Sequence, residues 1–176
     1  MIKFQVIANL CLLLFFLVID VALYCQNQAN NWYIGGNQAG VNFNSGVPIT
    51  LVNGANQYYS DGGTAGISDT LGNILFYTDG ETVWNRNHQI MLNGSGLEGD
   101  NSASQPALIV QKPGSHNLYY LFTVGSRYQQ YGLAYSIIDI NADAGNGSVI
   151  TKNQRMLASV WARDKLASVR HRNGND

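Results

Sequence analysis

The 176-residue chain has little charge, and this shortage limits the partners it can have. Asp, Glu, Lys and Arg make up 12% of the residues, about half the share that is usual in soluble domains. The formal net charge is −1, so the chain lacks the basic domain or stripe typical of nucleic-acid binding. Basic residues are more frequent after position 150, but apolar residues separate them. They predict a solvated face and no nucleic-acid partner.

The N-terminus is the longest apolar segment of the chain. Lys3 precedes an uninterrupted apolar run over 10–19, and Asp20 ends that run. This order of features is typical of a secretory signal peptide, and the run is about half the ~20 residues that a membrane-spanning helix needs. We therefore expect a signal helix in residues 1–25, cleaved after Cys25. Membrane contact is then expected only through an uncleaved signal segment.

Cysteine is confined to this segment, at Cys11 and Cys25. A lipoprotein signal would need a small residue before Cys25, and Tyr24 stands there instead. The mature chain, 26–176, therefore carries no thiol, which excludes a disulfide framework and cysteine-based zinc sites. We expect no cofactor.

Glycine and asparagine are abundant in this chain, with 19 and 20 residues respectively. Both residue types enter positive φ at low cost, so they favour tight turns. Between their clusters lie short runs rich in β-branched and aromatic residues, and none of them shows a sustained helical period. The pattern predicts an all-β fold.

One plan recurs three times: an apolar strand, a polar turn that contains glycine, and an aromatic strand. The copies are GISDTLGNILFYTDG (66–80), LIVQKPGSHNLYYLFTVG (108–125) and LASVRHRNGND (166–176). Their spacing is close to that of propeller blades, each of which needs neighbours on both faces. We expect an incomplete β-propeller domain over 26–176, with about two four-stranded blades and the start of a third.

The segments ISDTLGNILFYTDGETVWNRNHQIMLNGSGLEG (67–99) and SQPALIVQKPGSHNLYYLFTV (104–124) carry a family likeness. They resemble the N-terminal β-propeller region of secreted and surface proteins of the Bacteroidetes group that end in a gliding-motility-associated, type IX secretion sorting domain. The resemblance implies export to the cell surface or medium, and partners that include the missing blades of the same propeller. This chain has no sorting domain, so a protein that ends here is expected in the periplasm.

The segment DINADAGNG places Asp139, Asn141 and Asp143 at alternate positions, as in the start of a calcium loop. Its glycine falls one place late, and Ile150 occupies the position of the closing glutamate. A polar hairpin turn is therefore the favoured interpretation, with calcium as the alternative.

Asp79 and Glu81 form a carboxylate pair of the kind used in glycoside hydrolysis. The Asp-Gly dipeptide at 79–80, however, is more typical of a turn between strands. The three histidines, His88, His116 and His171, show no metal-ligand spacing. We expect His88 and His116 in exposed turns and no catalytic residue.

Hydroxyl and aromatic side chains provide the remaining candidates. Thr70 lies in an Asp-Thr-Leu triplet, the pattern of O-glycosylation in Bacteroidetes exported proteins. Tyr128 and Tyr131 lie in a loop and are candidates for contact with a ligand. The strand aromatics are expected to pack between blades: Tyr77, Tyr119 and Phe122. Packing is also expected from the apolar residues of the segment 74–91: Ile74, Phe76, Val83, Trp84 and Ile90.

These features together indicate a non-enzymatic binding, adhesion or display module for surface protein or polysaccharide. The alternative is that the chain is the N-terminal part of a propeller-type carbohydrate-active enzyme whose catalytic blades are missing, because propellers also host such sites.

Overall fold

The computed structural model describes residues 27–36, 38–55, 62–126, 132–157 and 165–168. These residues form β-strands joined by turns and by two short 3₁₀ segments, η2 (Asn27–Ala29) and η3 (Asp143–Gly145). The first three strands make an antiparallel sheet of their own, the N-terminal sheet: β1 (Asn31–Tyr33), β2 (Gly40–Asn42) and β3 (Ile49–Leu51).

The eight strands that follow form two antiparallel meanders of four strands each. The first meander consists of β4 (Ala65–Ser68), β5 (Ile74–Thr78), β6 (Thr82–Asn85) and β7 (Ile90–Ser95). The second meander consists of β8 (Ala107–Gln111), β9 (Leu118–Val124), β10 (Leu133–Asp139) and β11 (Ser148–Leu157).

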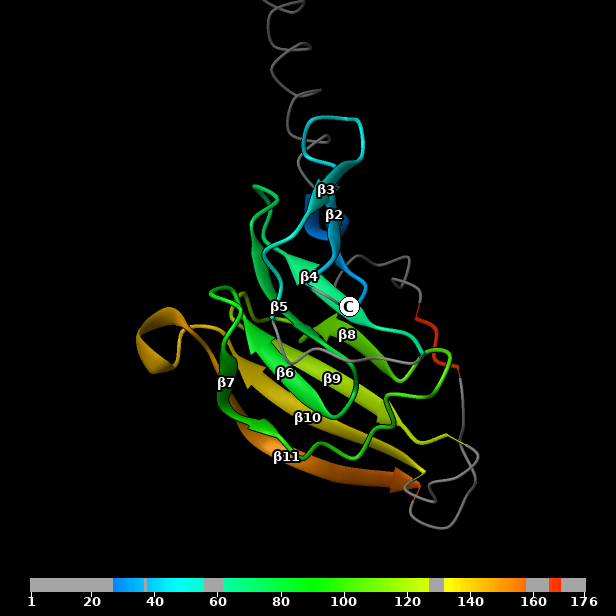
Figure 1. Cartoon of the computed structure of the whole chain (residues 1–176). Helices are drawn as coiled ribbons and strands as arrows, with labels where there is room; N and C mark the ends of the chain where they lie inside the picture. Colours follow the sequence, from blue (N-terminus) through cyan, green and yellow to red (C-terminus); the bar gives the residue numbers. More distant parts are fainter. Residues whose placement is uncertain (1–26, 37, 56–61, 127–131, 158–164, 169–176) are drawn as a thin grey trace, which may run out of the picture.

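The last strands of the two meanders join them into one sheet. β7 and β11 are parallel and pair at Leu92 and Ser148, giving the strand order β4-β5-β6-β7-β11-β10-β9-β8. β4 and β8, at the two ends of this order, also lie in contact. The sheet is therefore nearly closed on itself, and the two meanders face each other (Figure 1).

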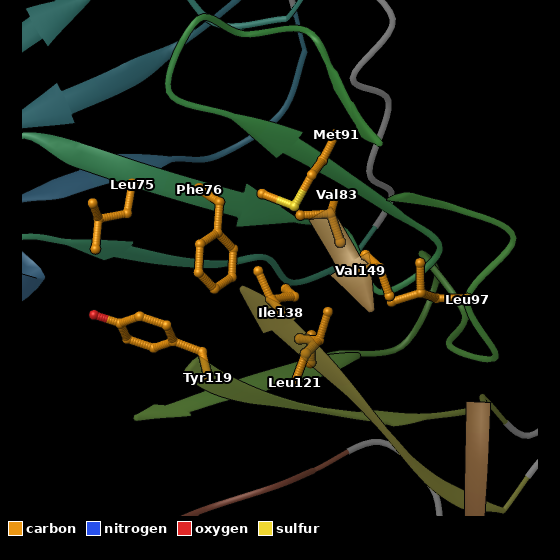
Figure 2. Packing of buried hydrophobic residues seen from close by; sticks show 10 residues of the cluster. Leu75, Phe76, Val83, Met91, Leu97, Tyr119, Leu121, Ile138 and Val149 are labelled. Carbon is orange, nitrogen blue, oxygen red and sulfur yellow. The ribbon is translucent and has the colours of Figure 1, made fainter. Parts of the chain in front are cut away.

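The main hydrophobic core fills the space between the meanders. Phe76 and Val83 point from the first meander toward Leu121 and Ile138 of the second (Figure 2). Phe76 has no exposed surface, and its ring meets that of Tyr119 edge to face at 5.6 Å between centroids. Successive strand residues point to opposite faces, so Tyr77, which follows Phe76, belongs to a different layer.

That second layer packs the N-terminal sheet against the first meander. Tyr77, also without exposed surface, stacks on Tyr33 of β1 at 4.5 Å and on Trp84 of β6 at 5.7 Å between ring centroids. The buried amide of Asn31 secures the contact, because it donates to the Ser68 hydroxyl (3.0 Å) and to a backbone carbonyl in the β4–β5 turn (2.6 Å). Both faces of the first meander are thus covered.

Side chains of β11 also bind across the junction between β7 and β11, which we call the seam. Asn153, at φ +55°, accepts a hydrogen bond from the backbone N–H of Glu98 (3.0 Å) and donates to the carbonyl of Gly96 (2.9 Å). Arg155 forms a two-pronged ion pair with the Glu98 carboxylate at 2.6 and 2.7 Å. The seam thus combines the strand pairing with side-chain bonds to the segment that follows β7.

The all-β prediction is confirmed, and the first two copies of the repeat each contribute the first two strands of a meander. Two details are corrected. Ile90, expected in the core, is 49% exposed. Phe122 lies on the face of the second meander that points away from the core, because its neighbours Leu121 and Thr123 face inward. Of the third copy, only residues 166–168 are described, and they form no strand.

The signal segment expected over 1–25 lies outside the described residues. Among the residues that are described, none belongs to a helix with the length and apolar character needed to cross a membrane.

Replacing Phe76 by alanine tests the packing between the meanders. We expect F76A to lower the free energy of unfolding by about 3–5 kcal/mol, because it removes a fully buried ring and leaves a cavity. Urea denaturation provides the measurement. Leu71→Ala is the control: Leu71 is 73% exposed, and its loss should cost less than about 0.5 kcal/mol. Equal effects of the two substitutions would contradict this core.

Thr123 offers a substitution that should increase the free energy of unfolding. Its hydroxyl is buried without a hydrogen-bond partner in the described part of the chain, so Thr123→Val should raise the free energy of unfolding by about 1 kcal/mol. Ser136→Ala is the matched control, because the buried Ser136 hydroxyl accepts the N–H of Asn153 at 3.1 Å. Its removal should be destabilising by about 1 kcal/mol. A loss of stability in T123V would contradict the unpaired hydroxyl.

Candidate functional site

The tightest arrangement of polar groups begins at the turn between β5 and β6. Asp79 is 5% exposed, and its Oδ1 accepts the backbone N–H groups of Glu81 (2.9 Å) and Thr82 (2.8 Å). Burial raises the pKa of the Asp79 carboxyl, and the nearby Glu81 charge adds to the increase, while the two N–H groups oppose it. Gly80 completes the turn at φ +94°, where a Cβ would lie 2.8 Å from Pro106. The turn predicted from Asp-Gly is therefore also a packing site.

Glu81 ties this turn to the long connection between β7 and β8. Its Oε1 accepts the backbone N–H of Asn101 at 3.1 Å, and its carbonyl accepts the N–H of Leu97 at 2.9 Å. The segment that precedes β4 joins the same assembly, because the Gly62 N–H donates to the Asn101 carbonyl at 2.9 Å. Three loops are therefore hydrogen-bonded to one another.

Asp100 extends the assembly to the end of β9. It is 5% exposed, its Oδ1 accepts the N–H (2.9 Å) and hydroxyl (2.6 Å) of Ser102, and its Oδ2 accepts the hydroxyl of Ser126. Burial alone would raise the pKa of the Asp100 carboxyl, but the hydrogen bonds from Ser102 and Ser126 hold it below its ordinary value. The Asp100 carboxyl therefore favours its charged form, and its hydrogen bond with Ser126 fixes the start of the β9–β10 connection.

We call residues 79–81, 96–106 and Ser126 the loop cluster. Three of its four carboxylates, those of Asp79, Glu81 and Asp100, each accept at least one backbone N–H group from a loop. This arrangement orders the loops before any ligand arrives. The candidate ligand residues Tyr128 and Tyr131 come shortly after Ser126 in the sequence and lie outside the described residues. Sequence reasoning did not single out Asp100, although the Asp-x-Ser pattern at 100–102 is a recognisable turn signal.

The calcium candidates lie at the other end of the second meander, in the β10–β11 connection. Asp139 Oδ1 accepts the backbone N–H of Asn141 and the side-chain amide of Asn117, each at 2.9 Å. Asp143 is exposed at φ +50° and begins η3. The described residues contain no group of three or more His, Cys, Asp or Glu side chains placed to hold a metal ion.

The remaining candidates occupy turns. Thr70 is exposed in the β4–β5 turn, where its carbonyl accepts the Asn27 amide at 3.0 Å. His116 is exposed in the β8–β9 turn, and His171 lies outside the described residues.

His88 does not lie in an exposed position, which corrects the expectation from the sequence. It sits at φ +62° in the β6–β7 turn, half-buried, with its ring 5.1 Å from that of Tyr33 and 5.9 Å from that of Tyr77. Its environment depends on Tyr33, a residue of the N-terminal sheet, so no local pattern could predict it.

A hydrogen-bonded chain links His88 to the segment that follows the N-terminal sheet. The Tyr77 hydroxyl accepts the backbone N–H of Ala55 at 2.8 Å and lies 3.2 Å from His88 Nδ1. Burial raises the pKa of Tyr77 to about 12 and lowers the pKa of His88. The hydroxyl therefore stays protonated and can donate to a neutral imidazole.

No protein-family model, curated protein or solved structure matches the chain.

Lowering the pH should weaken the contact at His88. The folded-state pKa of His88 lies below its ordinary value of 6.5, so the unfolded chain binds this proton more readily. The free energy of unfolding should therefore fall as the pH drops through 6.5 toward the folded-state pKa. Urea denaturation across this range provides the measurement.

His88→Gln should remove this part of the pH dependence, whereas His116→Gln, in the exposed β8–β9 turn, should preserve it. An unchanged pH profile in H88Q would show that His88 does not couple proton binding to folding.

Proposed function

We propose that the chain forms part of a β-propeller in which the N-terminal sheet and the two meanders are successive blades. The support comes from the first strand of each unit: β4 contacts both β1 and β8. In a propeller, the blades surround a common central channel, so strands that line it are neighbours of their counterparts in adjacent blades. The face-to-face packing of the meanders also fits this arrangement.

The function that this geometry favours is binding or adhesion by an exported surface module, with protein or polysaccharide as the partner. The observation that carries the proposal is the loop cluster, in which Asp79, Glu81 and Asp100 are engaged with backbone and hydroxyl donors. Acidic groups used in this way fix the shape of a surface. Tyr128 and Tyr131, in the adjoining loop, provide aromatic rings suited to stacking on a sugar or a protein side chain. Export relies on the signal peptide proposed for residues 1–25.

A second candidate function is glycoside hydrolysis, and one observation favours it. Burial raises the pKa of Asp79, which is the property that a general acid needs, and Glu81 is its neighbour in the turn. In this alternative the further catalytic groups belong to blades that are not part of this chain.

Polysaccharides and purified surface proteins, arrayed and probed with the full chain, provide the test. We expect a binding signal without release of reducing sugar, and a Tyr128→Ala/Tyr131→Ala variant should bind about tenfold more weakly because stacking contacts are lost. Near-equal affinity of this double variant would exclude the two tyrosines from the binding surface.

Asp79→Asn is the variant that separates the two functions. Asparagine keeps an oxygen for the N–H groups of Glu81 and Thr82 but cannot act as an acid, so the binding module should tolerate it. The hydrolase needs blades outside this chain, so the assay uses a longer form of the protein that contains them. Reducing-sugar release that disappears in D79N would support the hydrolase and overturn the binding module.

A further inference from the structure

Three Asn-Gly dipeptides lie in the described part of the chain, at 53–54, 93–94 and 146–147, and a fourth, at 173–174, lies outside it. In such a dipeptide the backbone nitrogen of glycine can attack the side-chain carbonyl carbon of asparagine, because glycine has no Cβ to hinder the approach. A C–N bond forms, the side-chain nitrogen leaves as ammonia with the N–H proton, and a five-membered succinimide results. Water then opens the ring to aspartate or isoaspartate. The sequence of steps consumes water, releases ammonia and needs no oxidant or reductant.

Hydrogen bonds hold both reacting groups at two of these dipeptides. In each, the asparagine side-chain oxygen accepts a hydrogen bond and the glycine N–H donates one to a backbone carbonyl. Attack requires the side chain to swing over the glycine nitrogen, so these bonds must open first. The partners are the Tyr33 hydroxyl (3.1 Å) and the Gln38 carbonyl (3.0 Å) at 53–54, and the Asn87 amide (2.8 Å) and the Ala142 carbonyl (2.9 Å) at 146–147.

The side chain of Asn93 is held far less firmly. It is exposed, and its amide nitrogen lies 3.5 Å from the Val149 carbonyl oxygen, at the outer limit of a hydrogen bond. The backbone at Asn93 has φ +58°, a left-handed conformation that few residues other than glycine adopt. The asparagine at 93 can therefore change its side-chain rotamer at a lower cost than those at 53 and 146.

The backbone around Asn93 also lies in an irregular part of the sheet. Residues 91–94 of β7 lie opposite the single residue Val83 of β6, because the register shifts between the flanking pairs. Such a bulge interrupts the ladder of hydrogen bonds locally. Packing requires glycine in the bulge, because a Cβ at Gly94 would lie 2.8 Å from the Met91 carbonyl oxygen and 2.9 Å from that of Val83. The fold therefore retains a reactive dipeptide at this position.

We propose that Asn93 is the site at which the folded chain deamidates spontaneously, with water as the co-reactant, and that the product weakens the seam. Aspartate at this position loses the amide donor and sets a carboxylate against the Val149 carbonyl. Isoaspartate lengthens the backbone by one atom directly after Leu92, the residue that pairs with Ser148 across the seam. Both products therefore act beside the strand pair that joins the meanders. The site is independent of the proposed function, since neither the number of blades nor a ligand enters the reaction.

Peptide mapping by mass spectrometry after incubation in mildly alkaline buffer tests the site, with the other two dipeptides as internal controls. Conversion of Asn93 should be faster than that of Asn53 or Asn146 by about tenfold or more, a factor that corresponds to a barrier difference of about 1.4 kcal/mol. The same incubation in urea removes the structure, so the three rates should converge. Equal rates in the folded chain, or a preference for Asn93 that persists in urea, overturn the proposed site.

Urea denaturation of fresh and aged protein tests the effect on the seam. Aged wild type should unfold at a lower urea concentration than fresh wild type. Asn93→Gly cannot deamidate at this position and adopts positive φ without strain, so its unfolding midpoint should not change with age. Asn93→Gln, which closes the larger ring far more slowly, replaces N93G if that variant does not fold. An equal fall in the midpoint of the aged variant, or no fall in fully converted wild type, would show that the product leaves the seam intact.

Discussion

Burial of both faces of the first meander is the constraint on which the rest of the structure depends. Phe76 and Tyr77 are adjacent on β5, point to opposite sides, and have no exposed surface. A single sheet packed on one neighbour would leave one of these rings in water, so a layer is needed on each side. The N-terminal sheet and the second meander meet this need, and the order of these three units follows from it.

Because charge is scarce, amides and a few carboxylates satisfy the polar groups that this packing buries. Asn31 bonds the N-terminal sheet to the β4–β5 hairpin, Asn153 bonds β11 to the segment after β7, and Asp100 bonds two loops. Buried polar atoms are normally paired in this way. The asparagine-rich composition thus has a structural role, since an amide both donates and accepts without the cost of burying a charge.

Features that depend on neighbours in sequence could be predicted, and features that depend on distant residues could not. The run of aromatic and β-branched residues over 118–124 predicts β9, and Asp-Gly predicts the turn at Asp79. Half-burial of His88 depends on Tyr33, in another sheet. Phe122 faces outward because Tyr119 and Leu121, on the other side of β9, pack against the first meander. In the loop cluster, the turn at Asp79 was predictable, but the bond between Asp100 and Ser126 joins different connections and leaves no local pattern.

The seam between β7 and β11 also has a consequence for the order of folding. Hairpins within each meander close short loops, whereas Leu92 and Ser148 pair only when the chain that forms most of the second meander has been brought back beside the first. Closing long loops is the slower process because it loses more chain entropy before any contact compensates. The meanders should therefore form as separate units and dock afterwards through β11. The amide hydrogens at this seam would then exchange with solvent earlier than those at the centre of either meander.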